Sequence, residues 1–120
     1  MNKPECKTYP NGDKWWYLNG DLHREDGPAL EYASGTKEWY LNGKRHREDG
    51  PAIEWTSGAK EWWLNGDLHR EDGPAIEYAN GYKVWYLNSE EVNPETIVDL
   101  WLAKNIYCFY NAETNSLEFD

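Results

Sequence analysis

The sequence contains three copies of the heptapeptide HREDGPA, at residues 23–29, 46–52 and 69–75. Each copy places an imidazole, a guanidinium and two carboxylates in four consecutive residues. Such a set could transfer protons or contribute ligands to a metal ion. Whether the copies can act together depends on the distance that the fold sets between them.

A period of 23 residues runs through most of the chain. The copies of a WYLNG-like motif lie at residues 16–20, 39–43, 62–66 and 85–89. A second turn signal, Asn-Gly or Ser-Gly, lies at residues 11–12, 34–35, 57–58 and 80–81. Two glycine turns in every period divide it into two extended segments, so the repeat unit is predicted to be a β-hairpin.

This architecture separates the three histidines. Successive hairpins advance by two strands of ~4.8 Å, which puts the histidines about 10 Å apart. Ligands of one zinc ion converge at ~2 Å, and catalysis usually needs one enclosed pocket. We therefore expect no catalytic residue, no metal site and no cofactor. The motif is predicted to form a structural ladder in which each arginine pairs with nearby acids. The ladder residues are His23, His46, His69, Arg24, Arg47 and Arg70.

The longer segment of each hairpin is expected to bend at its Gly-Pro pair. Gly50 tolerates unusual φ values and Pro51 lacks an amide donor, which places the pair at a bulge or a strand start. Residues 44–49 are expected to pair back with the preceding short strand. Residues 52–56 are expected to pair forward with the next one.

Alternation along the strands predicts two faces. The predicted core combines a tryptophan row and a leucine row with apolar residues of the longer segment. The tryptophan row is Trp16, Trp39, Trp62 and Trp85, and the leucine row is Leu18, Leu41, Leu64 and Leu87. Their expected partners are Leu30, Ile53, Ile76, Tyr32, Trp55 and Tyr78.

The opposite face is predicted to be largely exposed. It would carry a mixed aromatic row, which is Tyr17, Tyr40, Trp63 and Tyr86, beside Glu31, Glu54 and Glu77. Cross-strand packing that stiffens a thin sheet is one interpretation of these rows. A surface that binds a ligand or a partner is the other.

The ends of the chain depart from the repeat. Residues 3–9 are expected to start the sheet as an incomplete repeat. Residues 93–105 read as a helix with Asn93 at the N-cap and Pro94 at the first helical position. Its apolar stripe, expected to cover the last repeat, is Ile97, Val98, Trp101 and Leu102. A terminal hairpin is predicted from residues 106–110 and 116–119.

The length and charge of the chain indicate one domain and disfavour some classes of binding partner. The 120 residues suffice for one domain, residues 1–120, with repeats over 9–89 and a cap over 90–120. The net charge is −10, and residues 88–120 hold seven acids and one base. Direct binding to nucleic acid or to an anionic membrane is not expected, because that affinity rests on basic residues. An acidic surface is compatible with a basic protein partner.

Cellular location is predicted from the same composition. The chain has neither a signal-like start nor an apolar run of membrane-spanning length, which favours a cytoplasmic protein. Cys6 and Cys108 lie far apart in the sequence without a CxxC spacing and are expected to be free thiols. The chain is expected to be a monomer or a homodimer.

The repeats resemble a known family. The 23-residue period, the aromatic-x-x-Gly opening and the following Gly-x-x-His, at 20–23, 43–46 and 66–69, are similar to MORN repeats. The resemblance covers about residues 9–89 and is closest to variants with NGKxHREDGPA repeats from phages and bacteria. It implies a mainly β fold, an elongated single-layer antiparallel sheet of tandem hairpins, here with a C-terminal capping helix and hairpin. It also implies protein binding without enzyme activity.

Three functional hypotheses remain open at this point. The first is a protein-binding module that uses the mixed aromatic row with its glutamates, or the acidic C-terminal end. For a phage protein, the resemblance implies an inhibitor of a host or defence protein in the host cytoplasm. The second is a module that stacks a carbohydrate or a nucleotide on the mixed aromatic row. The third is an acidic mimic of nucleic acid.

Overall fold

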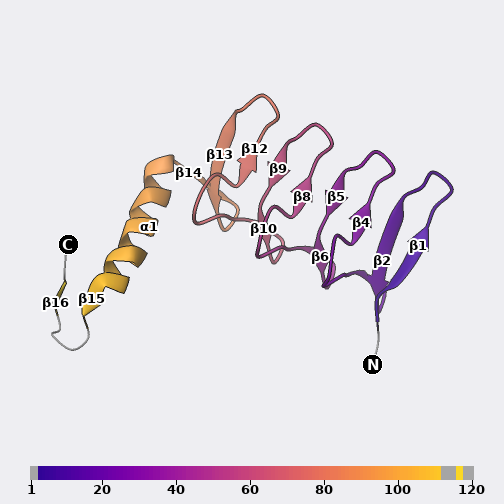
Figure 1. The fold of residues 1–120 in the computed structure, drawn as a ribbon, viewed down its shortest axis with the longest axis horizontal. Helices are drawn as coiled ribbons and strands as arrows, with labels where there is room; N and C mark the ends of the chain where they lie inside the picture. The colour runs from indigo at the N-terminus through magenta and orange to yellow at the C-terminus, as the bar shows by residue number, and fades with distance from the viewer. Residues whose placement is uncertain (1–2, 112–115, 118–120) are drawn as a thin grey trace.

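The fold is an elongated sheet of hairpins followed by a helix (Figure 1). The computed structural model describes residues 3–111 and 116–117, and side-chain exposure for residues 3–104. Among the described residues, fourteen strands precede the helix, and their pairings are antiparallel. The strands form one layer, as predicted from the repeat. The extents along the principal axes are 62 × 42 × 24 Å.

The first strands are β1 (Glu5–Thr8), β2 (Lys14–Leu18), β3 (Asp21–Leu22), β4 (Leu30–Glu31), β5 (Lys37–Glu38), β6 (Tyr40–Leu41) and β7 (Lys44–Arg45). The next are β8 (Ile53–Glu54), β9 (Lys60–Glu61), β10 (Trp63–Leu64), β11 (Asp67–Leu68), β12 (Ile76–Glu77), β13 (Lys83–Leu87) and β14 (Glu90–Val92). The sheet order is β1-β2-β4-β5-β8-β9-β12-β13-β14. The predicted start of the sheet within residues 3–9 is confirmed by the pairing of β1 with β2.

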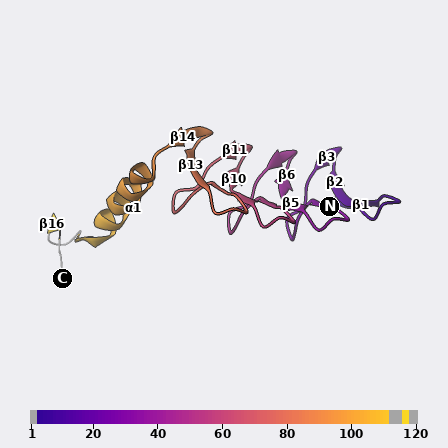
Figure 2. The same ribbon diagram turned by 90° about the horizontal axis from the view of Figure 1, so that it is seen from above.

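Smaller hairpins, β2–β3, β6–β7, β10–β11 and β13–β14, are closed by the LNG-type turns. In Figure 2, β3, β6, β10 and β11 project to one side of the main ladder. Asn42 and Gly43 both have positive φ, 51° and 79°, which is the requirement of a type I′ turn. Neighbouring small hairpins are joined by the amide of Gly43, which donates to the carbonyl of Leu22 at 2.9 Å.

The longer segment of each repeat does not form one bent strand. Lys44–Arg45 pairs back within the small hairpin, and the amide of His46 also donates to the carbonyl of Trp39 at 3.0 Å. The amide of Arg47 donates instead to Trp63 of the next repeat, and residues 48–51 form a bend outside the strands. Ile53–Glu54 then pairs forward with β9, as predicted, and also back with β5. Gly50 is not among the residues with positive φ. The expectation that the glycine supplies an unusual φ is therefore wrong.

The predicted partition of side chains between the faces is wrong. Ile53 lies directly opposite Glu38 and Glu61 in the ladder, and opposed residues point to the same side of a sheet. By alternation that side also carries the mixed aromatic row, and Tyr40 indeed bonds Glu38. We call this side the isoleucine face.

Glu31, Glu54 and Glu77 therefore lie on the other side, with the tryptophan row. Glu54 is opposed by Lys37 and Lys60, and its carboxylate is 2.8 Å from Nη1 of Arg47. We call this side the arginine face. Side chains alternate between the faces within each strand, as predicted. The alternation of the longer segment is shifted by one residue relative to the short strand, so its apolar residues and its glutamates lie on the opposite faces from those predicted.

The core is thin. Its buried hydrophobic residues are Ala29, Leu30, Ala52, Ile53, Ala75 and Ile97. Ile53 is 1% exposed, the largest fully buried side chain among the described residues. Trp55 and Tyr78, which were expected in the core, are 42% and 46% exposed and lie beside the Gly turns. The alanine of HREDGPA is thus an interior residue, whereas aromatic rings remain partly in solvent.

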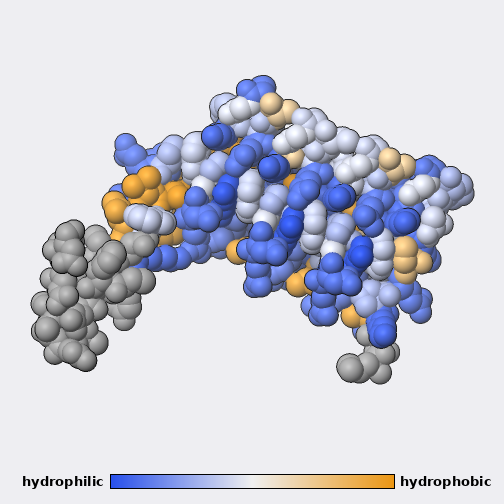
Figure 3. Space-filling view, viewed as in Figure 1, coloured by the Kyte–Doolittle hydropathy of each residue, from blue (hydrophilic) through white to orange (hydrophobic). Residues whose placement is uncertain are grey.

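Helix α1 (Pro94–Phe109) begins where predicted. Asn93 caps it, because its Oδ1 accepts the amide of Thr96 at 3.0 Å. Ile97 is buried, but Val98, Trp101 and Leu102 are exposed, so most of the expected stripe does not cover the last repeat. Figure 3 shows an apolar patch on the first part of this helix.

The predicted C-terminal hairpin begins later than expected. The helix continues through Phe109, and the first strand is only β15 (Tyr110–Asn111), paired with β16 (Ser116–Leu117). The predicted strand at residues 106–109 is therefore helical. The turn at 112–115 and the predicted strand end at Phe119 lie outside the described residues.

Candidate functional site

Each HREDGPA histidine holds the next repeat. Nδ1 of His23 accepts the amide of Asn42 at 2.9 Å, and His46 accepts the amide of Asn65 at 3.0 Å. His69 accepts the amide of Asn88 in the same way, at 3.0 Å. These amides belong to residues with positive φ in the turns that close the small hairpins. The histidine therefore fixes the turn of the following repeat.

The other ring nitrogen of each histidine faces a glutamate. Because Nδ1 accepts a hydrogen bond, the neutral ring carries its proton on Nε2. Nε2 of His69 is 2.9 Å from Glu71, and that of His46 is 3.9 Å from Glu48. Over the described part of the chain, no group of three or more His, Cys, Asp or Glu side chains could hold a metal ion.

Each HREDGPA arginine stacks on the tryptophan of its own repeat. The guanidinium carbon lies 3.9 Å from the ring centroid in all three pairs, Arg24–Trp16, Arg47–Trp39 and Arg70–Trp62. Nε of Arg47 donates to Asp49 at 3.1 Å, and Nη1 donates to the carbonyl of Pro51 at 3.1 Å as well as to Glu54. The arginine is thus held by an aromatic ring, two carboxylates and a carbonyl.

This arrangement explains the glycine. A Cβ on Gly50 would lie 3.0 Å from Cζ of Arg47, and one on Gly73 would lie 2.7 Å from Cζ of Arg70. Any larger residue at this position would force the guanidinium to shift, because it packs against the backbone there.

Open grooves separate successive HREDGPA loops on the arginine face. The central groove, of about 640 Å³, lies between the first and second copies, and Trp39 and Leu41 line it. The C-terminal groove, of about 650 Å³, lies between the second and third copies and is lined by Trp62 and Leu64. An N-terminal groove of about 420 Å³ adjoins Trp16. The same construction therefore recurs in successive repeats.

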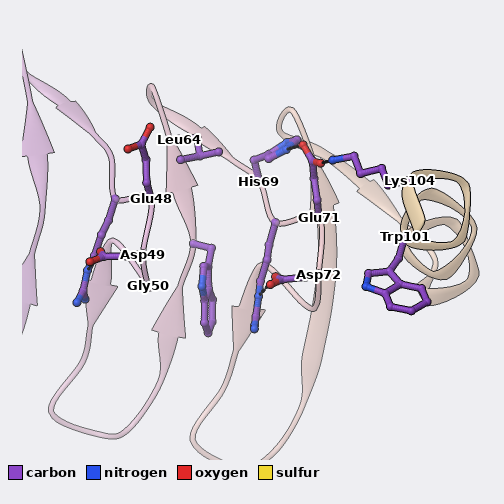
Figure 4. A pocket seen from close by; sticks show the side chains of 12 residues that line it. Glu48, Asp49, Gly50, Leu64, His69, Glu71, Asp72, Trp101 and Lys104 are labelled. Carbon is purple, nitrogen blue, oxygen red and sulfur yellow. Dashed lines mark hydrogen bonds and ion pairs between the residues drawn. The ribbon is translucent and has the colours of Figure 1, made fainter. Parts of the chain in front are cut away.

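Figure 4 shows the C-terminal groove. Glu48 and Asp49 come from one loop, and His69, Glu71 and Asp72 come from the next. Trp101 and Lys104 of α1 also line this groove, and Lys104 is ion-paired with Glu71. The helix thus adds a ring and a cation to one groove of the series.

The groove rims carry exposed carboxylates. The side chains of Glu25 and Glu48 are 83% and 85% exposed, and those of Asp26 and Asp49 are 87% and 89% exposed. The central groove is lined by these four carboxylates and two arginines, a net charge of −2 with neutral histidine. We call these carboxylates, with Glu71 and Asp72 of the third loop, the acidic ridge.

The mixed aromatic row that was expected to be largely exposed is half-buried in all four repeats. In the two middle repeats, the polar atoms of this row have partners within the chain. Tyr40 Oη donates to Glu38 at 2.9 Å, and Trp63 Nε1 donates to Glu61 at 3.0 Å. Burial, with Glu38 beside the hydroxyl, raises the pKa of Tyr40. This geometry matches cross-strand packing more closely than a free stacking surface.

Sequence reasoning missed Glu38, Glu61 and Arg45. Glu38 is 6% exposed and accepts Nε of Arg45 at 3.4 Å. Arg45 lies over the ring of Trp63, 5.0 Å from its centroid. The sequence offered one signal, which is a glutamate two residues before Tyr40 and before Trp63. The strand register is needed to show that these glutamates lie on the same face as the two rings.

Comparisons with protein-family models, with curated proteins and with solved structures find no match. Within the described residues, no helix has the length and apolar content needed to cross a membrane.

Proposed function

We propose that the chain is a non-enzymatic, MORN-like repeat module that binds a basic protein partner along the arginine face. The observation that carries this proposal is the recurrence of grooves that combine a tryptophan with an exposed acidic ridge. A repeated shallow surface suits an extended partner better than a small substrate, for which one enclosed pocket is usual.

Charge supports the class of partner. In the central groove, Arg24 and Arg47 already have acidic partners through Asp26 and Asp49. Within the part of the chain that the structure describes, the one ion-pair partner of Glu25 and of Glu48 is a histidine, at 3.7 and 3.9 Å. Both carboxylates are therefore available to a cation from outside. A cationic surface would be attracted to the ridge and oriented by it.

The arginine face is favoured over the mixed aromatic row as the binding surface. Tyr40 and Trp63 use their polar atoms on Glu38 and Glu61, so a partner would have to compete with contacts inside the protein. Glu25 and Glu48 of the ridge carry no arginine or lysine partner among the described residues, so a cation can reach them without such a rearrangement.

The test compares proteins captured from a host lysate by the wild-type chain and by two variants of equal charge. Glu25→Gln with Glu48→Gln removes two ridge charges. Glu90→Gln with Glu91→Gln removes two exposed charges of β14 and serves as the control. A partner retained by the control and bound about five- to tenfold more weakly by the ridge variant is expected. Equal retention by both variants would reject the ridge.

A further inference from the structure

The spacing of the grooves identifies the conformation of the partner segment. Successive grooves are related by one repeat, which advances the main ladder by two strands, β4 to β8 and β8 to β12. At ~4.8 Å per strand this advance is about 9.6 Å. A segment that places one side chain in each groove needs the same repeat length on one of its faces.

Peptide conformations differ in how they meet this requirement. A β-strand presents the same face every two residues, at about 6.6 Å and then 13 Å, and neither matches. A polyproline II helix has three residues per turn and a rise of 3.1 Å, so residues i and i+3 share a face about 9.3 Å apart. An α-helix aligns i and i+7 at about 10.5 Å. Over two groove spacings the polyproline II helix falls short by about 0.6 Å, and the α-helix overshoots by about 1.8 Å.

The groove chemistry identifies the side chain. Trp39 and Leu41 provide apolar surface at the central groove, and carboxylates of two loops flank it. A long basic side chain matches both, because its alkyl stem can lie on apolar surface while its charged head meets a carboxylate.

The three grooves differ in charge, which predicts their ranking. The central groove has a net charge of −2. The C-terminal groove includes Lys104 and has three cations against four carboxylates. In the N-terminal groove, Lys3 and Arg24 balance Glu25 and Asp26. The central groove should therefore hold a cation most strongly.

We infer that the arginine face binds a polyproline II segment with a basic residue at every third position, one side chain per groove. This inference rests on the proposed function and names the chemistry of the partner. Such a segment is already extended before binding, so little conformational entropy is lost when it docks.

Fluorescence anisotropy with three labelled peptides tests the inference. The first peptide has nine residues, with arginine at positions one, four and seven and proline elsewhere. The second has the same composition with its three arginines contiguous. The third is an alanine-rich helix with arginine at every seventh position. We expect the first peptide to bind about tenfold more tightly than either of the others. Replacing its central arginine with alanine should cost more than replacing either outer one.

The two charge variants connect this preference to the ridge. Glu25→Gln with Glu48→Gln should reduce the preference to about threefold or less, and Glu90→Gln with Glu91→Gln should leave it unchanged. All four side chains are exposed, and unchanged circular dichroism would verify folding. Equal affinity for the three peptides, with loss in the ridge variant, overturns the polyproline II inference and leaves the acidic ridge standing. Tighter binding of the helical peptide also overturns it. Failure of all three peptides to bind, or binding insensitive to the ridge variant, overturns both proposals.

Discussion

The two faces of the sheet carry one aromatic row each, but they use these rings differently. On the isoleucine face, which also carries the buried Ile53, Tyr40 donates a hydrogen bond to Glu38 and Trp63 donates one to Glu61. On the arginine face, Trp16, Trp39 and Trp62 each support a guanidinium, and open grooves remain between repeats. Similar residue types thus stabilise the sheet on one side and form a repeated surface on the other.

Removing the core of the isoleucine face should give the largest effect. Ile53→Ala removes the side chain that is 1% exposed, and we expect the free energy of unfolding to fall by about 2–5 kcal/mol. Leu64→Ala, at a half-exposed position lining the C-terminal groove, should cost clearly less. Urea denaturation followed by tryptophan fluorescence measures both. An equal cost at the two positions would contradict the assignment of the core to the isoleucine face.

The buried carboxylate of the same face should come next. Glu38→Ala leaves the hydroxyl of Tyr40 and the guanidinium of Arg45 without this acceptor, which we expect to cost about 1–3 kcal/mol. Tyr40→Phe should cost less in the Glu38→Ala background than in the wild type, because the shared hydrogen bond is already lost. Additive costs in this double-mutant cycle would show that Glu38 and Tyr40 do not stabilise each other.

The arginine face can be tested through the glycine beneath its guanidinium. Gly50→Ala brings a methyl group to 3.0 Å from Cζ of Arg47 and should cost about 1 kcal/mol. In an Arg47→Ala background the same change should be neutral or stabilising by up to about 1 kcal/mol, because alanine restricts the unfolded chain. Chemical denaturation of the four proteins measures this reversal. A cost that is the same in both backgrounds would mean that Arg47 is not the reason for the glycine.

The smallest expected effect is a titration on the isoleucine face. Burial, with the charge of Glu38 nearby, raises the pKa of Tyr32 to about 12. A raised pKa in the folded state contributes stability that is present below about pH 10 and is lost as the pH rises from 10 towards 12. Absorbance titration of the wild type and Tyr32→Phe, with folding followed by circular dichroism, should assign a late phenolate step to Tyr32. A step near pH 10 that disappears in the variant would contradict this prediction.

The parts of the fold that the sequence predicted are those governed by local geometry. The turns at Asn42-Gly43 adopt positive φ because few other dipeptides do so at low cost. The Asn93–Pro94 pair starts the helix because a cap and a fixed φ act within one turn. The 23-residue period predicted a tandem array of hairpins, and the resemblance to MORN repeats implied that they form a single-layer sheet.

The faces were not predictable in the same way. Alternation carries phase only along continuous extended backbone, and residues 46–51 interrupt it between β7 and β8. The side to which Ile53 points depends on its hydrogen bonds with β5 and β9. The same register places Glu54 beside Arg47 and Glu38 beside Tyr40.

Local residue chemistry was therefore sufficient for the hairpins, their turns and the start of the helix, because each depends on a few neighbouring residues. Three features depend on contacts between strands that an irregular loop separates: the stacking of Arg47 on Trp39, the grooves between loops and the burial of Glu38. Side-chain alternation cannot be followed through that loop, so the sequence does not show which side chains of the two strands share a face. Long-range strand pairing decides this. Because of this pairing, the HREDGPA residues line a repeated groove and do not converge on one reactive centre.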